Sequence, residues 1–296
     1  MISTIVATAE VDVAYPILES YAMKDGFIVL SENGIIDSFN WEGVKISSNE
    51  ISGNIIASDS NETFLTISSS KGDVFLISDN SEEKILSGVN CNAICLSENF
   101  ILLSTEDGDL LSIDKQGGRR ASVNLGNTTT MRISDDHNQI VVASEEGNMT
   151  VFNNDLEILR SSPPAKDDIE MVTNISPIVR GRFLVSRESL GVVVDDRPVN
   201  RLEFWHVKEG LLELVEIPSR ATSIQASGDG YYVGCFEGEL LWIERGKDPT
   251  LITNLGYSIT DLRIWEGDIL VSSWFYAVSY THLRAHETGR NLVCRL

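Results

Sequence analysis

The amino-acid sequence predicts an all-β protein, a β-propeller built from four-stranded antiparallel blades. Two observations predict this class. The first is an internal repeat of about forty residues, and the second is the content of each repeat, in which short apolar segments alternate with polar turns. No window keeps apolar residues at helical spacing without an early break by Gly, Asn or Ser. We expect about seven units, the last of them truncated.

Each unit begins with a polar turn that leads into a short, strongly apolar strand. The apolar strands include Phe27–Leu30 and Phe100–Leu103, which we interpret as buried central strands. The first turns of the successive units are Asp25-Gly26, Ser60-Asn61, Glu98-Asn99, His137-Asn138, Arg180-Gly181, Asp229-Gly230 and Glu266-Gly267.

A second turn, usually acidic and ending in Gly, follows the apolar strand, as in Thr105–Gly108. Gly is expected there because such hairpins commonly need one residue at positive φ. A third strand then alternates, as in Asp73–Ile77 and Leu240–Ile243, and a weaker fourth strand such as Glu157–Leu159 closes the unit. Four antiparallel strands in this order are typical of a propeller blade.

The fifth unit departs from this pattern, because the segment Arg187–Asn200 lengthens its hairpin. Long hairpin insertions commonly lie on one rim and can carry function, so this segment is a candidate partner-binding site. A surface insertion without function is an equally open alternative. The candidate residues are Arg187, Glu188, Asp195, Asp196 and Arg197.

From residue 18 to about residue 276 the chain resembles a WD-repeat or quinoprotein-like propeller, most visibly at Leu202–Val207. Trp205-His206 stands where a WD repeat has Trp-Asp, no Gly-His pair opens a unit, and the quinone-binding pattern is absent. The resemblance therefore implies the fold and does not imply a chemistry.

The repeat pattern stops at Val278. The string Val278–Thr288 resembles the forward translation of a transposase-type sequencing adapter, and Leu292–Leu296 resembles its continuation after a short variable index. The resemblance implies that residues 278–296 are non-native. Three side chains in this tail that might suggest ligands would then have no function: His282, His286 and Cys294.

We accordingly expect one propeller domain over residues 1–277, with the gene interrupted in the seventh unit near Tyr276. The N-terminal segment Thr4–Val13 is strand-like and has no turn partner of its own. Because propellers commonly close by pairing strands from both termini, we expect it to form the outer strand of the last blade. The interrupted blade should then expose a sheet edge.

The charge balance narrows the range of partners. The chain has 44 acidic and 23 basic residues and a formal net charge of -21, which repels nucleic-acid phosphates and anionic lipids. No apolar run approaches the ~20 residues of a membrane-spanning helix. The N-terminus lacks the basic start of a signal peptide. We expect a soluble, cytoplasmic protein that binds neither nucleic acid nor membrane.

Motifs for chemistry are missing from the sequence: there is no nucleophile elbow, phosphate loop, zinc-protease motif or dinucleotide fingerprint. His137 and His206 are interpreted as surface or packing residues, and the acidic pairs lack the spacing of a calcium loop. We expect no catalytic residue, no cofactor and no metal. Cysteines without Cys-x-x-Cys spacing are interpreted as buried apolar side chains: Cys91, Cys95 and Cys235.

Two functional hypotheses remain. The first is a non-catalytic scaffold that binds a protein or peptide partner through one rim. The alternative is a propeller enzyme or small-ligand sensor with its site at the central channel. Convergent carboxylates, His or Arg on the channel-lining strands would favour the alternative, whereas apolar or Ser/Thr side chains there would favour the scaffold.

Overall fold

The computed structural model describes residues 9–61, 63–78, 81–126, 128–133, 138–144, 147–163, 170–189, 198–265, 268–273 and 291–295. Within these ranges every regular element is a β-strand, and the strands form four-stranded antiparallel sheets. The predicted class, a β-propeller with four-stranded blades, is confirmed. The same ranges contain no helix that is long and apolar enough to cross a lipid bilayer.

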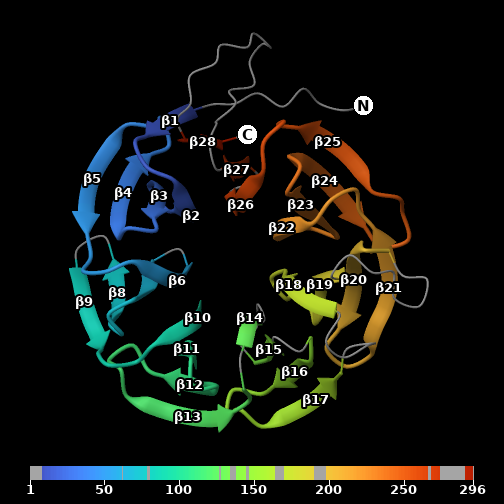
Figure 1. The fold of residues 1–296 in the computed structure, drawn as a ribbon, viewed down its shortest axis with the longest axis horizontal. Helices are drawn as coiled ribbons and strands as arrows, with labels where there is room; N and C mark the ends of the chain where they lie inside the picture. The colour runs from blue at the N-terminus through green and yellow to red at the C-terminus, as the bar shows by residue number, and fades with distance from the viewer. Residues whose placement is uncertain are drawn as a thin grey trace. The chain divides into compact units, whose positions relative to one another are not determined.

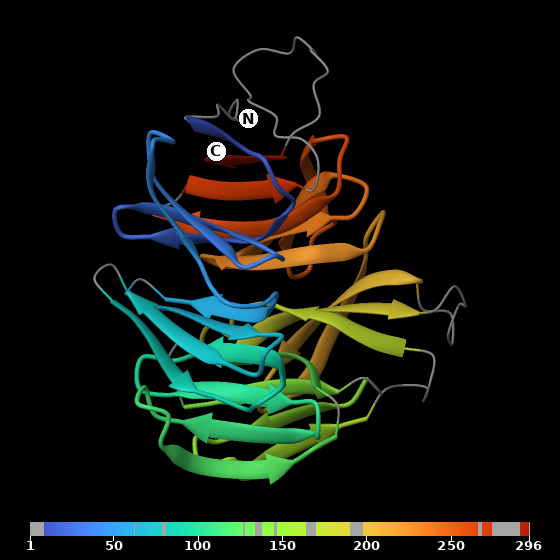
Figure 2. The same ribbon diagram turned by 60° about the vertical axis from the view of Figure 1, so that its left-hand side comes forward.

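The chain divides into two compact units, one made of residues 1–52 and 221–296 and the other of residues 53–220. The second unit contains four complete blades, each a meander of consecutive strands. Within this unit the last strand of each blade lies on the outer side (Figure 1), and neighbouring blades stack face to face (Figure 2). Its strands are β6 (Ile55–Ser60), β7 (Leu65–Ser69), β8 (Val74–Ser78), β9 (Ser81–Leu86), β10 (Cys91–Leu96), β11 (Ile101–Thr105), β12 (Asp109–Ile113), β13 (Arg119–Asn124), β14 (Thr128–Ile133), β15 (Ile140–Ser144), β16 (Met149–Phe152), β17 (Ile158–Ser162), β18 (Glu170–Ile175), β19 (Arg182–Ser189), β20 (Asn200–His206) and β21 (Gly210–Glu216).

The first unit contains two complete blades of the same kind. One blade consists of β2 (Ile17–Met23), β3 (Gly26–Ser31), β4 (Ile35–Asn40) and β5 (Lys45–Glu50). The other consists of β22 (Ala221–Ser227), β23 (Gly230–Cys235), β24 (Glu239–Glu244) and β25 (Thr250–Asn254). The expectation of one domain over residues 1–277 stays a prediction.

A further sheet of the first unit joins both ends of the chain, in the order β1 (Ala9–Val13), β28 (Asn291–Arg295), β27 (Asp268–Ser273) and β26 (Ile259–Trp265). Only β26 and β27 continue the repeat, so the predicted seven units become six complete blades and a two-strand remainder. The strand β28 lies in the segment that resembles a translated adapter. The predicted outer strand is confirmed for Ala9–Val13, which pairs with β28 at the sheet edge; residues 4–8 lie outside the described ranges.

The second strand of each blade is buried on both faces, as its continuous apolar sequence predicts. In β11, Leu102 packs with the blade β14–β17, whereas the adjacent Leu103 packs with the blade β6–β9. Each such side chain contributes about 1.5–3 kcal/mol by leaving water. The predicted glycines of the second turns all have positive φ: Gly34 92°, Gly72 76°, Gly108 83°, Gly147 78° and Gly238 93°.

Two β-bulges recur from blade to blade and were not predicted. One follows the first residue of each described first strand except β18, where it follows the third residue. The other lies in the outer strand of each complete blade and leaves one residue unpaired. The unpaired outer residues are Ile46, Ile85, Arg120, Leu159, Leu212 and Ile252. The bulge lies opposite the end of the third strand in the blades β2–β5, β10–β13, β14–β17 and β18–β21, and opposite its start in β6–β9 and β22–β25. Only the first four positions are therefore equivalent and provide matched comparisons between blades.

Candidate functional site

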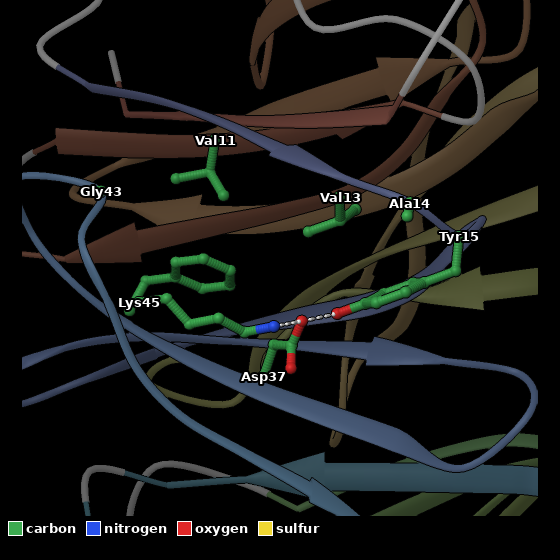
Figure 3. A pocket seen from close by; sticks show the side chains of 8 residues that line it. Val11, Val13, Ala14, Tyr15, Asp37, Gly43 and Lys45 are labelled. Carbon is green, nitrogen blue, oxygen red and sulfur yellow. Dashed lines mark hydrogen bonds and ion pairs between the residues drawn. The ribbon is translucent and has the colours of Figure 1, made fainter.

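A pocket of ≈ 450 Å³ lies between β1 and the blade β2–β5, inside the first unit (Figure 3). Its apolar walls come from the buried side chains of Val11, Val13 and Phe39, which belong to one core cluster with Ile17 and Val29. The complete lining is Val11, Val13, Ala14, Tyr15, Asp37, Phe39, Gly43 and Lys45.

Asp37 is the polar centre of this pocket, and its residue is only 1% exposed. It lies in the middle of β4 and pairs in register with Ser48 of β5, whose hydroxyl donates to Oδ1 at 2.6 Å. The Tyr15 hydroxyl donates to Oδ2 at 2.5 Å, and Lys45 Nζ lies 2.7 Å from the same oxygen. Tyr15 and Lys45 reach the carboxylate from opposite sides (Figure 3).

These contacts fix the protonation of the cluster. Burial of Asp37 opposes its ionisation, but hydrogen bonds from Lys45, Ser48 and Tyr15 outweigh burial and hold the pKa of the carboxyl below its usual value. Burial, followed by the hydrogen bond and charge of Asp37, raises the pKa of the Tyr15 phenol. The cluster therefore pairs a stable carboxylate with a phenol that keeps its proton, which suits positioning better than proton transfer.

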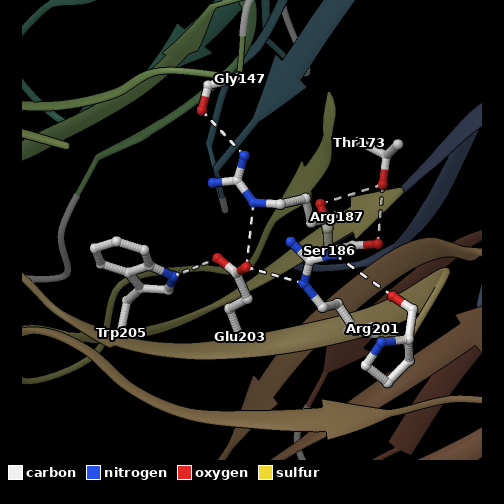
Figure 4. A network of polar contacts seen from close by, with 8 residues as sticks. Gly147, Thr173, Ser186, Arg187, Arg201, Glu203 and Trp205 are labelled. Atoms are coloured by element: carbon white, nitrogen blue, oxygen red, sulfur yellow. Dashed lines mark hydrogen bonds and ion pairs between the residues drawn. The ribbon is translucent and has the colours of Figure 1, made fainter. Parts of the chain in front are cut away.

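A second polar cluster is sealed inside the second unit, in the blade β18–β21 (Figure 4). Arg201, Glu203 and Trp205 occupy alternate positions of β20 and so face the same side, and Arg187 of β19 pairs with Arg201 in register. Glu203 Oε1 lies 3.2 Å from Nε of both Arg187 and Arg201, and its Oε2 accepts the Trp205 Nε1 proton at 2.9 Å.

This cluster is almost completely enclosed, since Arg201 is 0%, Glu203 1% and Arg187 3% exposed. Arg187 also donates to the carbonyl oxygen of Gly147 at 3.1 Å and so connects two neighbouring blades. Because a buried ion pair must offset the loss of hydration, its partners are held by hydrogen bonds on several sides. We interpret the cluster as structural: it holds β19 and β20 together where the lengthened hairpin begins, and it ties their blade to the neighbouring one.

Of the five candidate rim residues, the structure describes only Arg187 and Glu188. Arg187 and Glu188 belong to β19, and Arg187 is buried against Glu203, so its side chain is not offered to a partner. Glu188 is partly exposed and faces Arg220 at 3.7 Å. The remaining candidates, Asp195, Asp196 and Arg197, lie outside the described residues. A rim-binding role for the insertion stays a prediction.

The first strands of the first unit hold a third cluster. Asp261 of β26 accepts hydrogen bonds from the Ser223 hydroxyl at 3.1 Å and from the Ser20 backbone N–H at 3.3 Å. Arg263 Nε lies 3.1 Å from Asp261 and donates to the Ser20 carbonyl at 3.0 Å. A carboxylate and an arginine thus meet on these strands, a combination that would favour the enzyme hypothesis, but they bond to each other and connect β2, β22 and β26.

The other residues singled out from the sequence have ordinary surroundings or cannot be placed. His206 Nδ1 accepts from the backbone N–H groups of Lys208 and Glu209 at 3.3 Å, while His137 lies outside the described residues. Cys91, Cys95 and Cys235 are free and buried, as predicted. No group of three His, Cys, Asp or Glu side chains in the described ranges could hold a metal ion.

Exposed apolar side chains gather on the outer strands. Two lie in the blade β2–β5, namely Val44 and Ile46 at 61% and 64% exposure. Four others define what we call the outer apolar surface, on the adjoining blades β14–β17 and β18–β21: Ile158, Leu159, Leu211 and Leu214, which are 38–59% exposed. Arg160 of β17 donates to the Lys208 carbonyl at 2.8 Å, beside the turn that precedes β21, so the two blades that carry this surface contact each other there.

Sequence reasoning missed both Asp37 and Glu203. The only signal was a carboxylate inside an otherwise apolar strand, as in Ile36-Asp37 and Leu202-Glu203-Phe204. A buried carboxylate needs hydrogen-bonding or charged partners, so an acidic residue inside an apolar strand predicts a polar cluster. It does not predict which residues the partners are.

No protein-family model and no curated protein matches this sequence. Among solved structures, the chain is similar to the WD40 beta propeller domain of Doa1, with 12% identity and a TM-score of 0.72 over 98% of this chain and 95% of that one. It is also similar to BamB from Moraxella catarrhalis, with 10% identity and a TM-score of 0.64 over 97% and 98% of the two chains. The resemblance to WD-repeat-like and quinoprotein-like propellers is confirmed as a likeness of fold.

Proposed function

We propose that this chain is a non-catalytic cytoplasmic scaffold that binds a protein or peptide partner through the outer apolar surface. The observation that carries the proposal is the exposure of Ile158, Leu159, Leu211 and Leu214 on two adjoining blades. Exposed apolar groups that gather on one face of a protein commonly mark interaction sites.

The charges near this surface support a particular kind of partner. Glu157, Glu209 and Glu216 are exposed beside its four aliphatic side chains and outnumber the two cations there, Arg160 and Lys208. The whole chain carries a net charge of -21. A partner segment with an apolar face and flanking Lys or Arg residues would complement both features. The same charge supports a protein partner over nucleic acid or an anionic membrane.

A peptide-display selection on the immobilised full chain tests the proposal. We expect enriched peptides to combine apolar and basic residues and to bind the wild-type protein and the Ile46→Asp variant. They should bind the Leu159→Asp variant at least about tenfold more weakly, since a carboxylate would enter the apolar contact. Ile46 is the matched control because it is the equivalent, exposed bulge residue of another blade. Equal binding to all three proteins, or no enrichment, would overturn the proposal.

A further inference from the structure

The pocket at Asp37 has the volume of a small-molecule site and a lining of both polar and apolar groups. Its volume of ≈ 450 Å³ falls within the range of about 300–1,000 Å³ that is usual for ligand pockets. Val11, Val13 and Phe39 are each at most 6% exposed and are fixed in the core, so the apolar walls exist without a ligand. All eight lining residues lie in the first unit.

The polar groups of the pocket are unequal in what they can offer a ligand. Asp37 is buried and receives three donors, so it does not present a free carboxylate to the cavity. The Lys45 side chain is 48% exposed, and among the described residues Asp37 is its only anionic partner. An ammonium group has three N–H donors, so Lys45 can still donate to another acceptor.

We propose that this pocket binds a small organic carboxylate with a flat apolar body, whose carboxylate accepts hydrogen bonds from Lys45. The flat body would lie between the two valines of β1 and the rings of Tyr15 and Phe39. A cationic ligand is disfavoured because it would meet the Lys45 ammonium and find Asp37 already surrounded by donors. This site is independent of the outer apolar surface, which lies in the other unit.

The test uses three indole probes of similar shape and different charge on the full chain. They are indole-3-acetate, its neutral amide indole-3-acetamide, and the cation tryptamine. Binding is measured by ligand-observed NMR saturation transfer and by titration. We expect indole-3-acetate to bind with a Kd of about 1 mM or tighter, as its size allows. The neutral amide should bind about tenfold more weakly, and tryptamine should not bind detectably.

Two variants localise the binding. Lys45→Met removes the ammonium and keeps the apolar stem, and it should weaken indole-3-acetate binding about tenfold. Ala14→Trp places a large ring at an exposed lining position and should abolish binding of every probe. Lys84→Met is the control, because Lys84 also precedes the bulge residue of an outer strand, lies opposite Phe75, and has a similar exposure of 50%. It should leave binding unchanged.

Thermal unfolding of each variant verifies that it is folded at the assay temperature. Retained indole-3-acetate binding in Lys45→Met would overturn the proposal. Equal binding of the three probes to wild type, or no binding at 10 mM, would also overturn it. If Ala14→Trp does not fold, the comparison of Lys45→Met with Lys84→Met still decides the outcome.

Discussion

The two carboxylate clusters, around Asp37 and around Glu203, use similar chemistry in opposite surroundings. Asp37 is paired with a half-exposed lysine beside a pocket, whereas Glu203 is enclosed by two arginines that are both nearly inaccessible. An enclosed charge depends wholly on its protein partners, while a lysine at the surface retains water. The enclosed cluster should therefore govern stability, and the open one should be available for a ligand.

The largest effect is expected for Glu203→Gln. The substitution leaves Arg187 and Arg201 buried without this carboxylate and should lower the free energy of unfolding by about 3–5 kcal/mol. Urea denaturation followed by tryptophan fluorescence measures it. Glu188→Gln in the adjacent strand is the control, because its ion pair with Arg220 is partly exposed and should contribute less than about 1 kcal/mol. Equal costs for the two variants would show that the Glu203 cluster is hydrated.

A smaller effect, with a characteristic pH dependence, is expected for Asp37→Asn. Loss of the charged acceptor should cost about 1–3 kcal/mol at neutral pH. The folded-state pKa of Asp37 is lowered, so its contribution is present above the unfolded pKa of about 4 and is lost as pH falls through the folded pKa. Wild type and Asp37→Asn should therefore converge in stability below pH 4. A constant gap between their unfolding free energies from pH 7 to pH 2 would contradict the assignment.

The blades themselves could be predicted from the sequence, but their polar clusters could not. The signals for the blades are local in the sequence. An apolar run such as Phe100–Leu103 predicts one strand, and each glycine of a second turn predicts one residue with positive φ. The partners of Asp37 depend on pairing across strands. Lys45 lies opposite Phe39 only because the bulge at Ile46 shifts the register of β5 against β4. No residue type in the sequence predicts that bulge.

The position of Arg187 could not be predicted from the sequence either. Its place at the start of a long hairpin favoured a surface role, whereas the extended pairing of β19 with β20 carries it into the interior beside Glu203. The strand is longer than its counterparts in the other complete blades, so the hairpin begins later than the repeat pattern indicates. The outer apolar surface could not be predicted for a related reason. Whether an apolar side chain of an outer strand is exposed depends on how the neighbouring blade packs against it, which the sequence of the strand does not contain.

A third prediction concerns the alkaline side of the Asp37 cluster. Tyr15→Phe removes one donor and should cost about 0.5–1.5 kcal/mol at pH 7. Because the folded pKa of Tyr15 is raised, its contribution is complete below the unfolded value of about 10 and is lost as pH rises above it. The stability difference between wild type and Tyr15→Phe should shrink between pH 9 and pH 11. Tyr257→Phe, at an exposed position, is the control and should show no such change.

The smallest effects are expected at Lys45 and Lys84, each of which precedes the bulge residue of an outer strand and has an acidic partner. The difference between their effects measures what the pocket adds. Lys84 lies 3.4 Å from Asp73, which is 16% exposed, so Lys84→Met should change stability by less than about 0.5 kcal/mol. Lys45 lies 2.7 Å from a carboxylate that is almost inaccessible, so Lys45→Met should cost more, about 1 kcal/mol. Added salt should reduce the cost at Lys84 more than at Lys45, because screening acts mainly on exposed charges. Urea denaturation at low and high salt measures both differences, and equal costs at the two lysines would show that burial of Asp37 does not strengthen its ion pair.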